Sequence, residues 1–138
     1  MIESINPPDW AKPKGYSNGV LVDGTRLYVG GQIGWTKDQV FEASDFVGQL
    51  EQTLRNIVEI VRAAGGEPED IVRMTWFVTD KREYLARQAE TGQAYRRVMG
   101  RHFPAMSVIV VAGLIEDEAL LEIEATAEIG KSRGGKST

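Results

Sequence analysis

The chain has 138 residues and no cysteine, and its 20 acidic and 16 basic residues leave a net charge of −4. This length suits a single domain with a core of its own, and the lack of cysteine excludes disulfides and thiolate chemistry. The acidic, mixed charge argues against nucleic acid or an anionic membrane as a partner. No export signal or apolar run of membrane-spanning length is visible, so we expect a cytoplasmic protein.

The first predicted elements form a hairpin. Residues 20–22 and 27–33 are short apolar runs, which are typical of strands. Asp23-Gly24 between them favours the positive φ angles of a tight turn. We therefore expect two antiparallel strands here.

A helix is predicted next, because apolar residues recur every three to four positions and Ser44 and Asp45 precede them as caps. Gly65-Gly66 should end it. Its apolar stripe comprises Phe46, Leu50, Leu54, Ile57, Val58 and Val61.

A strand at 71–78 and a helix at about 82–101 follow. The strand is rich in β-branched and aromatic residues, and Pro104 forbids continuation of the helix. The strand should bury Val72, Met74, Trp76 and Val78, and the helix should turn Leu85, Ala89, Tyr95, Val98 and Met99 to one face.

Two final strands, at 107–112 and 120–129, complete the order β-β-α-β-α-β-β. This order predicts a single α+β domain over 1–129, with a mixed sheet and two helices on one face. Residues 130–138, GKSRGGKST, contain nothing apolar to pack, so they are predicted to be a disordered tail.

The stretch FPAMSVIVVAGLIEDEALLEIEATAEI at 103–129 resembles the closing hairpin of the reactive intermediate deaminase family, also called the Rid, YjgF or L-PSP family. The resemblance extends over most of the chain, through Tyr16-Ser17, the strand end VGGQ at 29–32 and RMT at 73–75. It implies a chorismate-mutase-like fold and a homotrimer with a small-molecule cleft at each subunit boundary. Apolar residues on both faces of the last strands are consistent with a partner chain.

Met106 departs from the pattern of the deaminating members. An arginine at this position in those proteins holds the carboxylate of an imino or enamino acid. A thioether carries no charge and donates no hydrogen bond, so it cannot replace a guanidinium. Val108 is a second departure, since cysteine or a small polar residue is common there. The resemblance therefore implies a substrate other than 2-iminobutanoate, with no ordinary deaminase activity.

Other cleft positions are retained. Glu122 matches the glutamate proposed to activate water, although strand alternation puts Glu124 on the same face and leaves open which one is buried. Tyr16 matches a cleft aromatic residue, and the alternative is a tyrosine that packs the edge of the domain. Gly30 stands where serine is usual, so Gly30 and Gly31 would hold substrate through their backbone unless they simply mark a strand bulge.

Several residues keep two interpretations. Trp35 and Trp76 could line a cleft or pack in the core, and we include Trp35 as a cleft wall. Arg26, Arg73 or Arg101 could restore the missing cation, although most surface arginines are only solvated.

No metal or cofactor is predicted. The single histidine, His102, lacks zinc-ligand neighbours and is explained more simply by contact with a helix dipole. Ribonuclease activity is disfavoured by one histidine and an acidic balance.

Two functional hypotheses follow. The first is hydrolysis or isomerisation of an imine-type metabolite directed by Glu122. The second is a noncatalytic trimer that binds a small molecule or docks on another protein. A buried Glu122 with a raised pKa would favour the first hypothesis.

Overall fold

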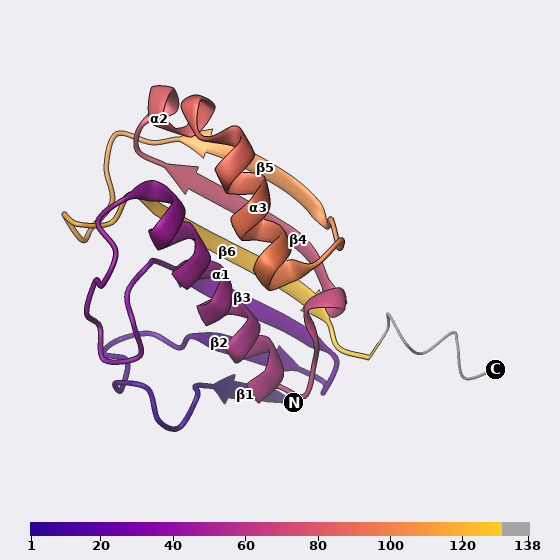
Figure 1. Cartoon of the computed structure of the whole chain (residues 1–138). Coiled ribbons are helices and arrows are strands. Elements are labelled where there is room, and N and C mark those ends of the chain that lie inside the picture. Colours follow the sequence, from indigo (N-terminus) through magenta and orange to yellow (C-terminus); the bar gives the residue numbers. More distant parts are fainter. Residues whose placement is uncertain (131–138) are drawn as a thin grey trace.

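The computed structural model describes residues 1–130 as one α+β domain (Figure 1). A six-stranded sheet has the order β1-β2-β3-β6-β4-β5, in which only the β4–β5 pair is parallel. Helices α1 and α3 lie on the same face of this sheet, so the predicted fold class is confirmed. Apart from Gly130, the predicted disordered tail lies outside the described residues. The elements are β1 (Ile2–Ile5), β2 (Gly19–Val22), β3 (Arg26–Gln32), α1 (Phe46–Ala63), the 3-10 helix η1 (Pro68–Asp70), β4 (Ile71–Val78), α2 (Lys81–Ala86), α3 (Gln88–Met99), β5 (Ala105–Val110) and β6 (Leu121–Glu128).

The first hairpin forms where the sequence predicts it. Asp23 and Gly24 have φ angles of 52° and 74°, and the turn places Val22 opposite Arg26. Strand β1, which pairs with β2, was not predicted. Its four residues are too few to show alternation, and three of them are exposed.

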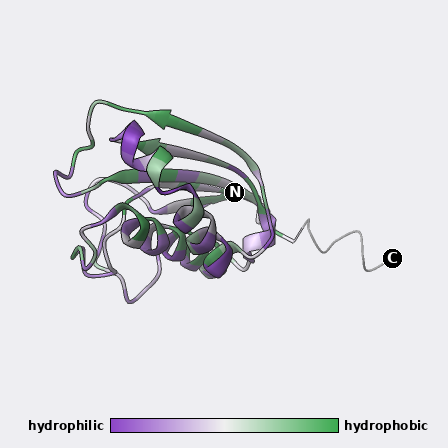
Figure 2. Ribbon diagram, turned by 45° about the horizontal axis from the view of Figure 1, so that its top comes forward, coloured by the Kyte–Doolittle hydropathy of each residue, from purple (hydrophilic) through white to green (hydrophobic). Residues whose placement is uncertain are grey.

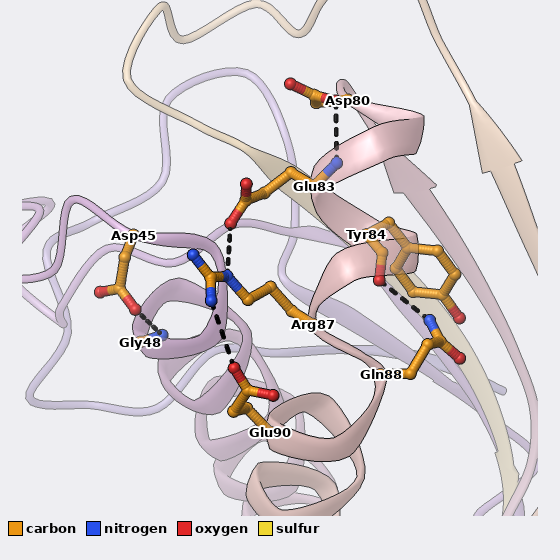
Figure 3. Close-up of polar contacts among 8 residues, drawn as sticks. All are labelled: Asp45, Gly48, Asp80, Glu83, Tyr84, Arg87, Gln88 and Glu90. Carbon is orange, nitrogen blue, oxygen red and sulfur yellow. Dashed lines mark hydrogen bonds and ion pairs between the residues drawn. The ribbon is translucent and has the colours of Figure 1, made fainter.

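Helix α1 carries most of the core contact with the sheet. The side chain of Asp45 accepts a hydrogen bond from the backbone N–H of Gly48 at 3.2 Å (Figure 3). Gly65 follows the helix with a φ of +90°, as expected for a helix terminator. The predicted stripe is buried, and each such leucine or isoleucine contributes about 1.5–3 kcal/mol. Among the described residues, no helix is long and apolar enough to cross a membrane.

The prediction that Val72 faces the core is wrong. The pairing of β4 with β6 shifts register between Ile71 and Arg73, which marks a bulge. The bulge places Ile71 in the core and leaves Val72 44% exposed. Beyond it, Met74, Trp76 and Val78 are buried as predicted.

The single helix predicted at 82–101 is two helices. The backbone breaks at Arg87, whose side chain pairs with Glu83 (2.8 Å) and Glu90 (3.4 Å) across the junction (Figure 3). Helix α2 has no buried residue: Leu85 is 57% exposed, contrary to the prediction, and Ala89 at the start of α3 is also exposed. Tyr95 and Met99 are buried and Val98 is partly buried, as predicted. Gly100, with a φ of 65°, ends α3.

Strand β5 forms one edge of the sheet, and Figure 2 shows its largely hydrophobic colouring. It begins and ends two residues before the predicted strand, because parallel pairing with β4 starts at Ala105, directly after Pro104. Every residue of β5 is exposed. An unpaired apolar edge of this kind is a surface that proteins ordinarily cover. Its large apolar side chains are Met106, Val108, Ile109 and Val110.

Candidate functional site

A cavity of about 360 Å³ lies where β3 ends and β6 begins, and we call it the Glu122 cavity. Its walls come from the segment before β2, from β3 and the residues after it, and from β6. Five residues that the sequence analysis assigned to a cleft line it together: Tyr16, Gly30, Gly31, Trp35 and Glu122.

Glu122 is the more buried of the two glutamates on its face of β6. Its side chain is partly buried, whereas Glu124 is exposed. Burial raises the pKa of Glu122, and repulsion by the charge of Glu124 raises it further. The sequence left open which of the two glutamates is buried. The structure shows that Glu122 is the more buried one, at a cavity and with a raised pKa.

Gly31 makes room for this carboxyl group. A Cβ atom at Gly31 would lie 2.7 Å from the carboxyl carbon of Glu122, which is closer than real side chains approach. Pairing of β3 with β6 shifts register between Val29 and Gln32, so Gly30 and Gly31 form a bulge. The bulge and cavity interpretations therefore describe the same place, since the bulge lets Glu122 lie against the backbone.

Gly30 differs from its expected role. Its backbone N–H, assigned to substrate, donates instead to the carbonyl oxygen of Asn18 at 2.8 Å. Behind it, the buried Gln32 amide donates to the Gly30 carbonyl and to Asn18 Oδ1, each at 3.2 Å. Asn18 in turn donates to Asn6 Oδ1. This polar wall was missed, because Asn18 and Gln32 lie 14 positions apart and no spacing rule connects them.

Two buried amides of α1 hold loops that lie next to the sheet. Gln49 donates to Ala43 O and Glu118 O and accepts from the N–H of Leu120 at 2.8 Å, which fixes the loop leading into β6. Asn56 donates to Trp35 O at 2.7 Å and also to the carbonyl of residue 33. Since a buried amide must find partners, Asn56 ties one wall of the Glu122 cavity to the core, whereas Gln49 fixes the approach to β6 beside a separate cavity.

Met106 and Val108 do not line the Glu122 cavity of the same chain. Met106 pairs with Met74 in the β4–β5 register and therefore points to the helix side of the sheet. There it lines a second cavity of about 180 Å³ between α3 and β5, which we call the α3 cavity. Val108 lines neither cavity.

The three arginines considered as replacements lie elsewhere. Arg26 pairs with Glu128 at 2.7 Å, Arg73 lines a separate cavity with Glu124, and Arg101 is exposed. None of the three lines either the Glu122 cavity or the α3 cavity.

His102 does not end a helix as predicted. It lies beyond α3, and its Nε2 is 2.6 Å from the carbonyl oxygen of Ile71. Within residues 1–130, no group of three or more His, Cys, Asp or Glu side chains is placed to hold a metal ion.

Comparison with known proteins connects this geometry to a family. The model of the family described as Endoribonuclease L-PSP matches residues 9–129. The chain belongs to this family. It is 39% identical over 84 residues to a RutC family protein of Haemophilus influenzae, a match that covers 61% of this chain and 64% of that protein. It is 31% identical to the RutC family protein UK114 of Drosophila melanogaster, covering 91% of this chain and 88% of that protein.

The solved structures agree. TdcF of Escherichia coli, crystallised with bound serine, superposes with a TM-score of 0.77 at 31% identity, covering 91% of this chain and 98% of that one. The resemblance to the Rid, YjgF or L-PSP family is thus confirmed for both family and fold. As a member of the L-PSP family, the chain combines a partly buried glutamate on β6 with a methionine on β5.

Proposed function

We propose that this L-PSP family protein hydrolyses a small imine or enamine-type metabolite in clefts formed between copies of the chain. The observation that carries the proposal is Glu122, a partly buried carboxyl group with a raised pKa that faces a cavity and lies against Gly31. A carboxylate in such a setting suits general base chemistry, because its acidity is moved toward neutral pH.

The chemistry assigned to Glu122 is the activation of water. The ionised carboxylate takes a proton from a water molecule as the water oxygen attacks the imine carbon, and the imine nitrogen takes a proton from solvent. The protonated carboxyl group then gives its proton to the nitrogen of this adduct. The C–N bond breaks to release ammonia or an amine, and the adduct's hydroxyl group loses its proton to solvent and becomes the carbonyl group. Tyr16 and Trp35 would form the walls around the substrate, and the backbone of Gly31 would lie beneath it.

The assembly proposed for this reaction is a homotrimer. Its support is the exposed apolar strand β5, together with the separation of Met106 and Val108 from Glu122 within one chain. Placed against the Glu122 cavity of a neighbouring copy, β5 would complete the cleft. Met106 would then offer an apolar wall and no cation, so the preferred substrate lacks the α-carboxylate of 2-iminobutanoate.

Ribonuclease activity, which the family description names, is not part of the proposal. The one histidine of the chain contacts the Ile71 carbonyl and does not line the Glu122 cavity. RNA cleavage without a metal needs an acid, a base and a basic surface, and the net charge of −4 argues against such a surface.

The test measures ammonia released from imines that a flavin amine oxidase generates in solution. Wild type should accelerate release, and Glu122→Gln should lower this acceleration about 100-fold or more, as expected for loss of a general base. Glu124→Gln, which alters the exposed glutamate on the same face, is the matched control and should change the rate little. If wild type accelerates no imine, the hydrolase proposal fails and the noncatalytic binding hypothesis replaces it.

A further inference from the structure

Two of the residues that line the α3 cavity each have a buried side-chain polar atom that lacks a partner. Trp76 Nε1 and Thr91 Oγ1 make no hydrogen bond within the described part of the chain, although the two residues are only 3% and 7% exposed. An unsatisfied buried polar group costs about 1–3 kcal/mol. Two of them beside one cavity indicate a place where a ligand supplies the missing partners.

The same cavity contains an unpaired cation. Arg96 of α3, an exposed residue, lines it, and its guanidinium forms no hydrogen bond or ion pair with the residues of the range 1–130. Other arginines of this region behave differently: Arg87 pairs with two glutamates, and Arg97 pairs with Glu51 at 2.9 Å. Arg96 is therefore an available charge at the cavity.

Gly92 gives the guanidinium group its position. One helical turn before Arg96, a Cβ atom at Gly92 would lie 3.3 Å from Arg96 Nη1, so the guanidinium lies over the bare backbone of the helix. Glycine inside a helix costs about 1 kcal/mol relative to alanine. Its presence in α3 is explained by the room it leaves for the side chain of Arg96.

These unsatisfied groups share one chemical property. The indole N–H only donates, the guanidinium only donates, and the Thr91 hydroxyl can donate. We propose that Arg96, Trp76 and Thr91 form an anion-binding site that holds a carboxylate of the ligand. The aromatic rings of Tyr95 and Phe103, stacked with centroids 5.7 Å apart, give this site an apolar wall.

The inference rests on the proposed function where it concerns the substrate. With Met106 on β5 uncharged, a carboxylate held from α3 occupies a different place from one held at position 106. The substrate class is then an imine without an α-carboxylate that carries an anionic group further along an apolar or aromatic body. The chain thereby supplies a cation from α3 in place of the one that β5 lacks.

The probe is phenylacetate, with phenylacetamide as its uncharged counterpart of nearly equal shape. In ¹H–¹⁵N spectra of the full chain, phenylacetate should shift the Trp76 indole N–H resonance, assigned with Trp76→Phe, in a saturable titration. Arg96→Met should weaken phenylacetate at least 10-fold, and Arg96→Lys should weaken it less. Phenylacetamide should bind at least 10-fold more weakly than phenylacetate.

Arg101→Met is the matched control, since Arg101 is exposed nearby and does not line the cavity. Equal affinity of wild type and Arg96→Met, equal affinity for the two probes, or an unmoved Trp76 resonance would overturn the site. Phenylacetate is not hydrolysed, so its binding is scored without the reaction. If imine hydrolysis fails while these binding results hold, the anion site stands and the proposed function falls. If hydrolysis is seen and Arg96→Met binds phenylacetate and hydrolyses the imine as wild type does, the proposed function stands and the anion site falls.

Discussion

The Glu122 cavity and the α3 cavity differ in how completely their polar groups are satisfied. Around the Glu122 cavity, the amides of Asn18, Gln32 and Asn56 bond to one another or to backbone groups. In the α3 cavity, Trp76 Nε1 and Thr91 Oγ1 have no partner among the described residues. The polar groups around the Glu122 carboxyl group are hydrogen-bonded within the chain, whereas two donors beside the α3 cavity have no acceptor there.

This difference shows how a family site can change its specificity. Chemistry that depends on Glu122 needs rigid surroundings, and substitution there would disturb several hydrogen bonds at once. In our proposals, recognition of the rest of the substrate falls to β5 and α3, where Met106 is uncharged and Gly92 leaves room for the guanidinium of Arg96. We infer that ligand preference has been altered in the second cavity while the first kept its chemistry.

The largest expected effect on stability comes from removing the buried amide of Gln49, which holds the loop before β6. Gln49→Leu keeps the side-chain volume nearly constant but leaves Ala43 O, Glu118 O and the Leu120 N–H unpaired. We expect a loss of about 3 kcal/mol or more in the free energy of unfolding, measured by urea titration. Gln93→Leu, on the exposed side of α3, should change it by less than about 0.5 kcal/mol. A similar loss in both variants would contradict the bracing role.

A smaller effect is expected at the floor of the Glu122 cavity. Gly31→Ala places a methyl group where the carboxyl group of Glu122 lies and should displace it, at a cost of only about 1 kcal/mol because the end of a flexible side chain can move. It should also slow imine hydrolysis, with phenylacetate affinity at the α3 cavity unchanged. Gly113→Ala is the control, because a Cβ there meets nothing within 4 Å. Equal rates in the two alanine variants would show that the position of Glu122 does not depend on Gly31.

The smallest effect is a pH dependence of stability. Because burial raises the pKa of Glu122 above the ordinary value of 4.5, the folded chain binds this proton more tightly than the unfolded chain does. Glu122 therefore disfavours folding above its folded pKa, and this penalty is absent below 4.5. Urea titrations at pH values from below 4.5 to above the folded pKa should show Glu122→Gln gaining stability relative to wild type as pH rises. A constant or shrinking difference would contradict the assigned shift.

Sequence patterns predicted the fold where periodicity was long and terminators were strong. The stripe of α1 between Asp45 and Gly65 is an example. Prediction failed where one residue changes the phase of a pattern, as at the β4 bulge that exposes Val72 and at Arg87, where one helix becomes two. Neither event leaves a signal in hydrophobic periodicity, because each is decided by pairing with another strand or by ion pairs across a junction.

The candidate site was predicted in part, through family resemblance. Positions carried over along the chain placed Tyr16, Gly31 and Glu122 at one cavity. The resemblance did not indicate Arg96, because the arginines that could replace the missing cation were Arg26, Arg73 and Arg101, none of which belongs to α3. The available signal was Gly92, a glycine one turn before an arginine inside a helical pattern.

The most direct test of the account compares ammonia release from 2-iminobutanoate by wild type and by Met106→Arg. The account predicts that wild type is slow and that the new guanidinium raises the rate about 10-fold or more, the value of one charge-assisted hydrogen bond. That result would show that the residues around Glu122 are catalytic and that the wild-type chain lacks only a carboxylate-binding group at position 106. Equal rates in the two proteins, whether fast or indistinguishable from the uncatalysed reaction, would contradict it.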